Sequence, residues 1–254
     1  MTQERRYIKN WQNIMNNRYL FCFTFAGGTT AFYDSLEQCL TDDIQVIKLD
    51  YSGHGKRYHE PLLSNFEQTA DDLFSIIIKD YSEIIYNPDN EVALMGYSMG
   101  SITAVEILKR FLALDGVCRP AHVFLAAHEP FSNHTLENLP EDSVDEYVKE
   151  RTIAFGGIPD RLIHNKSFWR MYLPLYKADY LMIARYHFEE LHLHTDIPVT
   201  VFYSESDTKY QDMQNWREYF EGKCDFVEYK GSHFFIHDYY KEMSEVIKAD
   251  WSSL

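Results

Sequence analysis

One serine of the sequence lies in a five-residue segment whose glycine spacing is typical of a reactive hydroxyl. Ser98 is the centre of Gly96-Tyr-Ser-Met-Gly100. The apolar run 91–95 predicts a strand before this segment, and the pattern from about 99 to 114 predicts a helix after it. The glycines permit a tight turn that exposes the serine Oγ, and the helix N-terminus presents the Met99 N–H to developing negative charge. We therefore predict that Ser98 is a nucleophile and that Met99 contributes to an oxyanion hole.

A serine hydroxyl is a weak nucleophile until a base accepts its proton, and an acid must orient that base. Where the serine occupies a strand-to-helix turn, the acid and then the histidine follow it in the chain, with the histidine after the last strand. Of the eleven histidines, His233 has this position, between the strand predicted at 224–229 and the helix predicted at 237–249. We therefore expect His233 to be the base. Other histidines are interpreted as residues of loops or helix surfaces: His54, His59, His164 and His187.

Three carboxylates are candidates for the role of the acid. Asp207 follows the strand predicted at 197–203, and Glu205 is its near neighbour. Glu129 comes just after the strand predicted at 122–127 and is the alternative. A loop that follows a strand delivers its carboxylate to the edge of the sheet where the serine lies, and we favour Asp207 for this position.

A second backbone donor for the oxyanion is predicted in an early loop. Phe25-Ala-Gly-Gly-Thr29 follows the strand predicted at 20–25. Its glycines let the backbone come close to a substrate, and in folds with this serine turn the second donor comes from such a loop. We therefore expect the Ala26 N–H to complete the oxyanion hole with that of Met99.

Short apolar runs alternate with helical patterns along the rest of the chain, which predicts the elements that position these residues. Alternation of this kind favours an α/β fold with a mainly parallel sheet and helices on both faces. The predicted strands are 20–25, 44–49, 91–95, 122–127, 197–203 and 224–229, and the predicted helices are 31–40, 66–85, 99–114 and 237–249.

The segment from about 129 to 194 interrupts this alternation. It has no convincing strand pattern, several helical patterns and many large apolar residues. Insertions of this length between strands are usually functional, and this one leaves the sheet where the carboxyl ends of strands form ligand sites. We interpret it as a helical lid over the active site, within a single domain that comprises residues 1–254.

Composition narrows the class of protein. The formal net charge of −15 disfavours nucleic acid and anionic membrane surfaces as partners. The polar N-terminus predicts no signal peptide, and no apolar run approaches the roughly eighteen residues of a membrane span. Four widely spaced cysteines fit reduced thiols in the cytosol and no zinc site. We therefore expect a cytoplasmic protein that needs neither a metal nor a cofactor.

Several segments together resemble the type II thioesterases that accompany nonribosomal peptide and polyketide synthases, and the related medium-chain thioesterases of fatty acid synthesis. The similar segments occur in the family's order across nearly the whole chain: Phe23-Thr-Phe-Ala-Gly-Gly28, Ala31-Phe-Tyr33, Tyr51-Ser-Gly-His-Gly-Lys-Arg57 with Glu60-Pro-Leu62, Leu94-Met-Gly-Tyr-Ser-Met-Gly100, Leu173-Pro-Leu-Tyr-Lys-Ala-Asp179 and Gly231-Ser-His-Phe-Phe-Ile236. This chain departs from the family pattern at four places: Tyr97 replaces a histidine, Ser232 a glycine, Tyr51-Ser52 a proline and His54 an arginine.

The resemblance implies an α/β-hydrolase fold and hydrolysis of acyl groups from the phosphopantetheine arm of an acyl or peptidyl carrier protein. It implies Ser98 as nucleophile, His233 as base, Asp207 as acid, and Ala26 and Met99 as oxyanion donors. We expect a monomer that binds the carrier protein transiently. Because carrier proteins are typically acidic, we also expect a basic patch, formed by Lys56, Arg57, Lys166, Arg170, Lys177 and Arg185.

Two other functions fit parts of the pattern. A small-molecule carboxylesterase or lipase would use the same fold and would turn over oxygen esters faster than thioesters. A hydrolase-like binding protein without activity would usually lack one of the three catalytic residues, and all three are present here.

Overall fold

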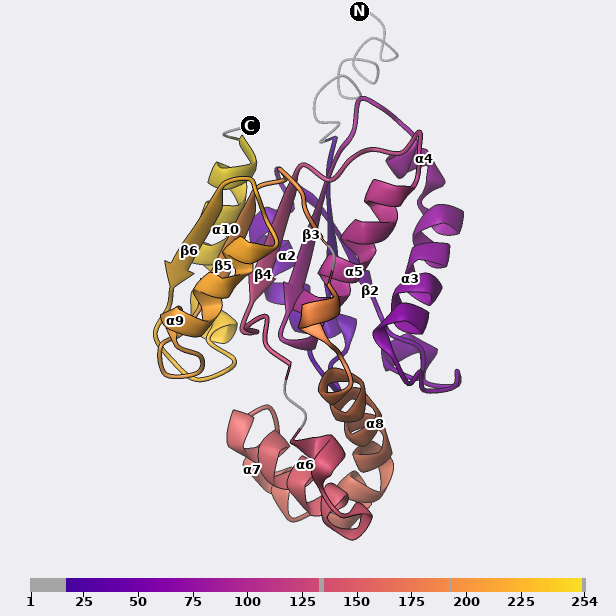
Figure 1. The fold of residues 1–254 in the computed structure, drawn as a ribbon, viewed down its shortest axis with the longest axis vertical. Coiled ribbons are helices and arrows are strands. Elements are labelled where there is room, and N and C mark those ends of the chain that lie inside the picture. Colours follow the sequence, from indigo (N-terminus) through magenta and orange to yellow (C-terminus); the bar gives the residue numbers. More distant parts are fainter. Residues whose placement is uncertain (1–16, 133–134, 192, 253–254) are drawn as a thin grey trace, which may run out of the picture.

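Six strands form one parallel sheet, in a computed structural model that describes residues 17–132, 135–191 and 193–252 (Figure 1). They pair in the order β2-β1-β3-β4-β5-β6, and every pair is parallel. The α/β prediction is thereby confirmed, whereas the N-terminal residues that predict no signal peptide lie outside the described residues. The strands are β1 (Arg18–Phe23), β2 (Gln45–Leu49), β3 (Glu91–Tyr97), β4 (His122–Ala126), β5 (Val199–Tyr203) and β6 (Cys224–Glu228).

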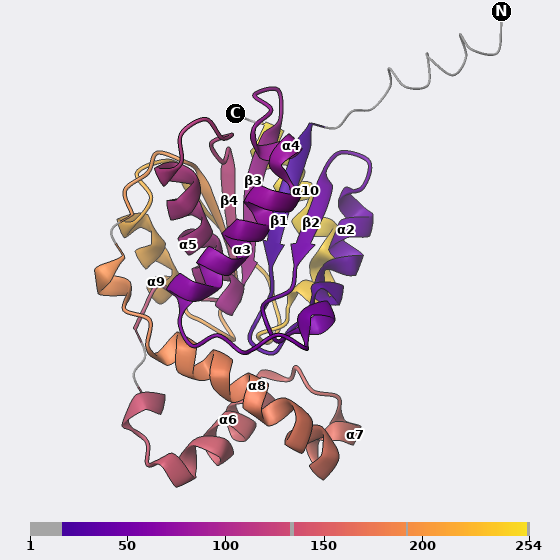
Figure 2. The ribbon, with the colours of Figure 1, turned by 90° about the vertical axis from the view of Figure 1, so that its right-hand side faces the viewer.

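Helices cover both faces of the sheet (Figure 2). One face carries α3 (Phe66–Asp80), α4 (Ser82–Ile85) and α5 (Met99–Ala113), and the other carries α2 (Asp34–Leu40) and α10 (Ile236–Ser252). Side chains alternate along a strand, so in β1 Phe21 packs with the first group of helices and Leu20 with the second. Burial on both faces explains why the inner strands β1, β3, β4 and β5 are mostly apolar.

Helix boundaries differ from the predicted ones where the backbone turns sharply. The helix predicted at 66–85 is two helices, because Tyr81 between α3 and α4 has a non-helical conformation (φ −124°, ψ 24°). A 3₁₀ helix, Thr30–Tyr33, precedes α2 in the range predicted as one helix. The sequence also gave no sign of α9 (Tyr210–Met213) or of the 3₁₀ helix Gln214–Glu218 between β5 and β6.

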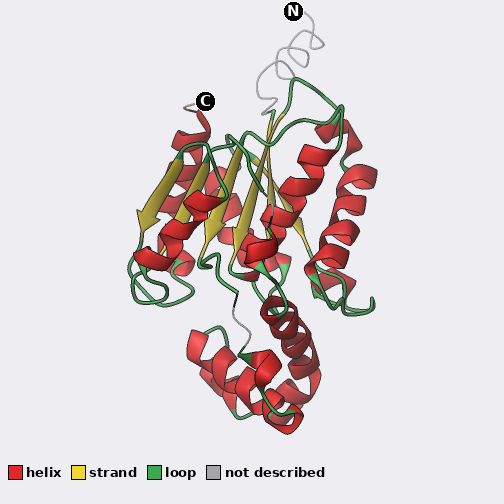
Figure 3. Cartoon of the chain, viewed as in Figure 1, coloured by secondary structure: helices red, strands yellow, loops and turns green. Residues whose placement is uncertain are grey.

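Three helices of the segment between β4 and β5 lie beyond the carboxyl ends of the strands (Figure 1). They are α6 (Glu141–Phe155), α7 (Asp160–Ile163) and α8 (Lys166–Ala184), with the short 3₁₀ helices Leu136–Asn138 and Phe188–Glu190 on either side of them. Figure 3 shows helix and loop in this segment apart from its undescribed residues. The helices share a hydrophobic cluster of their own that includes Val148, Trp169 and Tyr176. We call these three helices the lid.

The sequence predicts no membrane span and no zinc site, and the described part of the chain bears on both. There, no helix is long and apolar enough to cross a membrane. No group of three or more histidine, cysteine, aspartate or glutamate side chains that could hold a metal occurs among the same residues. All four cysteines are free.

Candidate active site

Ser98 lies on the sharp turn between β3 and α5. Its backbone is in a positive-φ conformation (φ 53°, ψ −119°), which is rare for a residue with a Cβ and marks stored strain. The two flanking glycines are needed by close packing, because a Cβ on Gly96 would overlap the Gly100 carbonyl and one on Gly100 would overlap that of Phe23. Strand register contributes to this arrangement, since Phe23 at the end of β1 pairs with Gly96.

The side chains of Ser98, His233 and Asp207 form a continuous chain of contacts. The His233 Nε2 lies 3.0 Å from the Ser98 Oγ, and its Nδ1 lies 2.9 and 3.0 Å from the two Asp207 carboxylate oxygens. All three side chains are largely buried. The structure thus brings together the three residues that the sequence predicts as nucleophile, base and acid.

His233 is held by contacts on several sides. Its loop follows β6, and the Tyr97 hydroxyl donates a 2.6 Å hydrogen bond to the His233 carbonyl oxygen. Burial raises the pKa of Tyr97 well above its ordinary value, so this hydroxyl keeps its proton at any pH of interest. The Phe155 ring of the lid lies 4.2 Å from the imidazole, between ring centroids. Tyr97 of β3 therefore restrains the backbone of His233, and Phe155 of the lid packs against its ring.

The two other candidate carboxylates are engaged elsewhere. The Glu129 Oε2 accepts a 3.3 Å hydrogen bond from the Thr208 hydroxyl. The Glu205 carboxylate accepts from the Tyr210 N–H at 2.8 Å, at the beginning of α9. Asp207 is thus the carboxylate whose contact with His233 is direct.

Two backbone N–H groups lie free beside the serine turn. Among the described residues, neither the Ala26 nor the Met99 N–H has a protein acceptor. Ala26 belongs to the turn after β1, in which the Gly28 N–H donates to the Phe25 carbonyl at 2.9 Å and Gly27 has a positive φ of 76°. Met99 is the first residue of α5, whose N-terminus favours negative charge.

A cavity of about 250 Å³ opens at these residues. Ser98, Ala26 and His233 line its floor, and the lid supplies much of the remaining wall. Leu136 of the preceding 3₁₀ helix also lines the wall, and the lid residues there are mainly large and apolar or aromatic: Tyr147, Phe155, Tyr176, Tyr180 and Ile183. His128 also lines the cavity, and burial lowers its pKa.

The structure corrects our interpretation of one histidine. His54 was expected on a loop surface, but it is 2% exposed, and its Nε2 lies 2.9 Å from the Asp179 carboxylate of α8. His59, His164 and His187 are exposed, as expected. Sequence reasoning missed Asp179 as well, although an aspartate within the largely apolar pattern of α8 was a signal that could have identified it.

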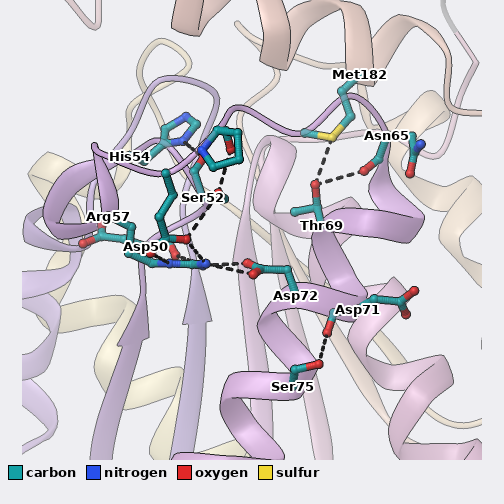
Figure 4. Close-up of polar contacts among 12 residues, drawn as sticks. Asp50, Ser52, His54, Arg57, Asn65, Thr69, Asp71, Asp72, Ser75 and Met182 are labelled. Atoms are coloured by element: carbon teal, nitrogen blue, oxygen red, sulfur yellow. Dashed lines mark hydrogen bonds and ion pairs between the residues drawn. The ribbon is translucent and has the colours of Figure 1, made fainter.

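The predicted basic patch is partly taken up by ion pairs. Arg57 points inward and pairs with Asp72 and Glu60 (Figure 4). Lys177 pairs with Asp145 at 2.9 Å, and Arg185 lies 3.7 Å from Glu137. The remaining three residues of the predicted patch, Lys56, Lys166 and Arg170, are exposed.

Comparison with known proteins extends these observations. Residues 18–250 match the family described as "Thioesterase domain". The medium-chain S-acyl fatty acid synthase thioesterase of Rattus norvegicus is 27% identical over 85% of this chain and 81% of its own length. The gramicidin S biosynthesis protein GrsT of Aneurinibacillus migulanus is 24% identical over 89% of this chain and 86% of its own.

Solved structures show the same fold. ClbQ from the colibactin NRPS/PKS pathway superposes with a TM-score of 0.80 at 23% identity, covering 93% of this chain and 98% of its own. YbtT, a type II thioesterase from the yersiniabactin NRPS/PKS biosynthetic pathway, gives a TM-score of 0.79 at 21% identity, with 94% of each chain covered.

Proposed function

This chain belongs to the thioesterase domain family, and from this premise we propose that it hydrolyses acyl thioesters on the phosphopantetheine arm of carrier proteins in nonribosomal peptide or polyketide biosynthesis. The observation that carries the proposal is the contact chain from Ser98 through His233 to Asp207 beneath an apolar lid. The names of relatives support the setting, since ClbQ is described by the colibactin NRPS/PKS pathway and GrsT by gramicidin S biosynthesis.

In the proposed reaction, the Ser98 Oγ attacks the thioester carbonyl carbon while the His233 Nε2 accepts the hydroxyl proton. Asp207 accepts a hydrogen bond from the Nδ1–H, which fixes the ring and stabilises the imidazolium. The Ala26 and Met99 N–H groups donate to the oxyanion, and each such donor is typically worth about 2.7–4 kcal/mol. Collapse of the tetrahedral intermediate expels the thiolate, which takes the proton from His233 and leaves an acyl-enzyme.

Deacylation repeats these steps with water as the nucleophile. His233 removes a proton from water, hydroxide adds to the acyl carbonyl, and the Ser98 oxygen leaves with the proton that His233 returns. The chain's own residues suffice for this sequence, and we propose no metal or cofactor for it.

The substrate has two parts that the site would treat differently. The aromatic and apolar lining of the cavity suits an acyl chain, because burial of apolar surface stabilises such a complex by about 25 cal/mol per Å². The pantetheine arm would enter past the lid from a carrier protein docked transiently outside. We further propose a cytoplasmic monomer with one domain that includes the lid.

The test is hydrolysis of a panel of acyl-carrier proteins by the wild-type protein and by Ser98→Ala. We expect release of free acid by the wild type and none above background by the variant. Thioester activity that survives in Ser98→Ala would refute the mechanism. Turnover of simple oxygen esters that far exceeds turnover of every acyl-pantetheine thioester would select a carboxylesterase instead.

A further inference from the structure

A buried carboxylate of the lid contacts the loop that we propose as part of the oxyanion hole. Asp179, in α8, is 2% exposed. Its Oδ2 accepts a 2.7 Å hydrogen bond from the Gly27 N–H and lies 2.9 Å from the His54 Nε2. One oxygen atom therefore joins the lid to the loop after β1 and to the loop after β2.

Gly27 occupies a position where this contact controls the backbone. It is the third residue of the turn 25–28, and its N–H belongs to the central peptide, whose flip would interconvert the type I and type II forms. A flipped peptide would turn the Ala26 carbonyl oxygen toward the Asp179 carboxylate, where the two would repel. Tyr176 lies on the same face of α8, and a Cβ on Gly27 would overlap its ring. One helix face therefore fixes the turn through a hydrogen bond and a packing contact.

His54 carries a proton on both ring nitrogens. Its Nδ1 lies 3.0 Å from the Ser52 carbonyl oxygen, and its Nε2 faces the Asp179 carboxylate. Both partners can only accept a hydrogen bond, so both nitrogens donate and the ring is an imidazolium. Burial opposes this charge, but the Asp179 carboxylate, the Ser52 carbonyl and Asp50 outweigh it and raise the pKa of His54 above 6.5.

The loop that holds His54 is itself firmly anchored. Asp50, directly after β2, accepts hydrogen bonds from the Thr30 N–H at 2.8 Å and from the Lys56 N–H at 3.0 Å. The Arg57 guanidinium reaches the Asp50 carbonyl and the Asp72 carboxylate (Figure 4). The imidazolium is therefore presented to Asp179 by a rigid support.

We propose that the His54–Asp179 ion pair positions the oxyanion loop by holding the Gly27 N–H, and that the turn carrying the Ala26 N–H is held less firmly once His54 loses its charge. Neither side chain lines the cavity, so both are positioning residues that act through Gly27. The inference rests on the proposed function only in requiring that Ser98 attack an acyl carbonyl.

The pair makes the activity depend on pH in a defined direction. The charged groups that face His54 are Asp179 on α8 and Asp50 after β2. When pH rises through the pKa of His54, the ring loses its charge and keeps one N–H for two acceptors, the Asp179 carboxylate and the Ser52 carbonyl. The attraction that holds the Asp179 carboxylate in place is weakened, and kcat falls. The pH profile of kcat therefore has an alkaline limb due to His54.

The first test compares two isosteric changes in the lid, Asp179→Asn and Asp145→Asn. Asp145 is the control, because its carboxylate is half exposed and pairs with Lys177 on the lid surface. We expect Asp179→Asn to lower kcat about tenfold or more with little change in KM. Complete loss of an oxyanion donor lowers kcat by about 10²–10³-fold, and a displaced donor should cost part of that factor. Asp145→Asn should stay within about twofold of the wild type. Equal kcat values for the two variants would overturn the proposal.

The second test measures the fall in kcat at alkaline pH, and it does not require that Asp179→Asn folds. In His54→Gln the side chain cannot titrate, so the limb should disappear and kcat should be lower at neutral pH. In His54→Arg the charge persists above about pH 12, so the limb should move out of range while kcat stays near that of the wild type. An alkaline limb that is unchanged in both variants would overturn the proposal.

Both tests use p-nitrophenyl butyrate beside an acyl-pantetheine thioester, with melting temperatures measured for each variant. If the protein hydrolyses the ester but no thioester, the proposed function is wrong. The kinetics of the variants on the ester then still test the role of His54 and Asp179. If both substrates respond alike to the variants, the effect lies in the shared oxyanion step.

Discussion

The Tyr97 hydroxyl donates a 2.6 Å hydrogen bond to the His233 carbonyl oxygen, which joins the residue before the proposed nucleophile to the backbone of the proposed base. The position of Tyr97 is set by β3, whose register pairs it with Ala126. The tyrosine that departs from the family's histidine thus has a definite structural task. It ties the loop after β6 to the centre of the sheet.

Tyr97→Phe should lower both stability and activity. The change leaves the buried His233 carbonyl without its partner, at a cost of about 1–3 kcal/mol in unfolding free energy, and it loosens the base, so kcat should fall more than KM changes. Denaturant unfolding and steady-state kinetics measure the two effects. Tyr229→Phe is the matched control, because the Tyr229 hydroxyl is buried without a partner among the described residues, so its removal should be neutral or stabilising. Equal losses in both variants would contradict the assignment.

Asp207→Asn should reduce kcat by a factor on the order of 10⁴, because an amide in place of the carboxylate favours the wrong imidazole tautomer. Glu129→Gln should cost less than about tenfold, since the Glu129 carboxylate accepts a hydrogen bond from Thr208 whereas the His233 Nδ1 lies against Asp207. Single-turnover acylation of each variant compares the two carboxylates directly. The reverse order of effects would transfer the role of the acid to Glu129.

His122 should make the fold sensitive to acid. The Thr200 hydroxyl donates to Asp250 at 2.7 Å and therefore accepts from the His122 Nε2–H at 2.9 Å, which leaves a neutral ring with a buried, unpartnered Nδ1. Burial lowers the pKa of His122 from 6.5 to about 4. Protonation therefore favours the unfolded chain, and about 3 kcal/mol of stability should be lost as pH falls from 6.5 to 4.

The measurement is the unfolding free energy at pH 7 and pH 4.5 for the wild type and His122→Gln. The glutamine amide can still donate to Thr200 and does not titrate, so the variant should lose less stability on acidification. An identical pH dependence in both proteins would show that other groups cause the acid sensitivity.

Exposed basic residues of the lid should matter only for carrier-bound substrates. Lys166→Glu with Arg170→Glu should raise KM several-fold for an acyl-carrier protein at low salt and leave an acyl-pantetheine thioester unaffected. The difference should shrink as ionic strength rises. Lys79→Glu with Lys241→Glu, the same double charge reversal on α3 and α10 away from the lid, is the control. No change in KM for the carrier-bound substrate would remove these residues from the docking surface.

Much of the fold could be predicted because burial on both faces of a parallel sheet leaves continuous apolar runs. Strand ends were harder, since β3 extends past the predicted 91–95 to Tyr97 because Gly96 pairs with both β1 and β4 and Tyr97 pairs with β4. The single non-helical residue that divides 66–85 also leaves no trace in the apolar spacing. Such details depend on neighbours in space that a local pattern does not contain.

The candidate site likewise has residues that could be predicted from the sequence and a contact that could not. Ser98, His233 and Asp207 could be proposed because each follows a recognisable element and their order is fixed. The contact of His54 with Asp179 joins residues 125 positions apart. Asp179 stands out in the apolar pattern of α8, but nothing in the local sequence identifies His54 as its partner. The interpretation of His54 as a surface residue was wrong for this reason, since burial of a loop is decided by what packs over it.

The separate hydrophobic cluster of the lid has an evolutionary consequence. Because Val148 and Trp169 pack among lid residues, their substitutions are buffered from the packing of the sheet. Descendants of one ancestral chain could therefore differ in the lid residues around the cavity while they retain the same catalytic residues. Acyl preference would then drift between lineages through α6 and α8, at positions where Ser98 and its partners impose no selection.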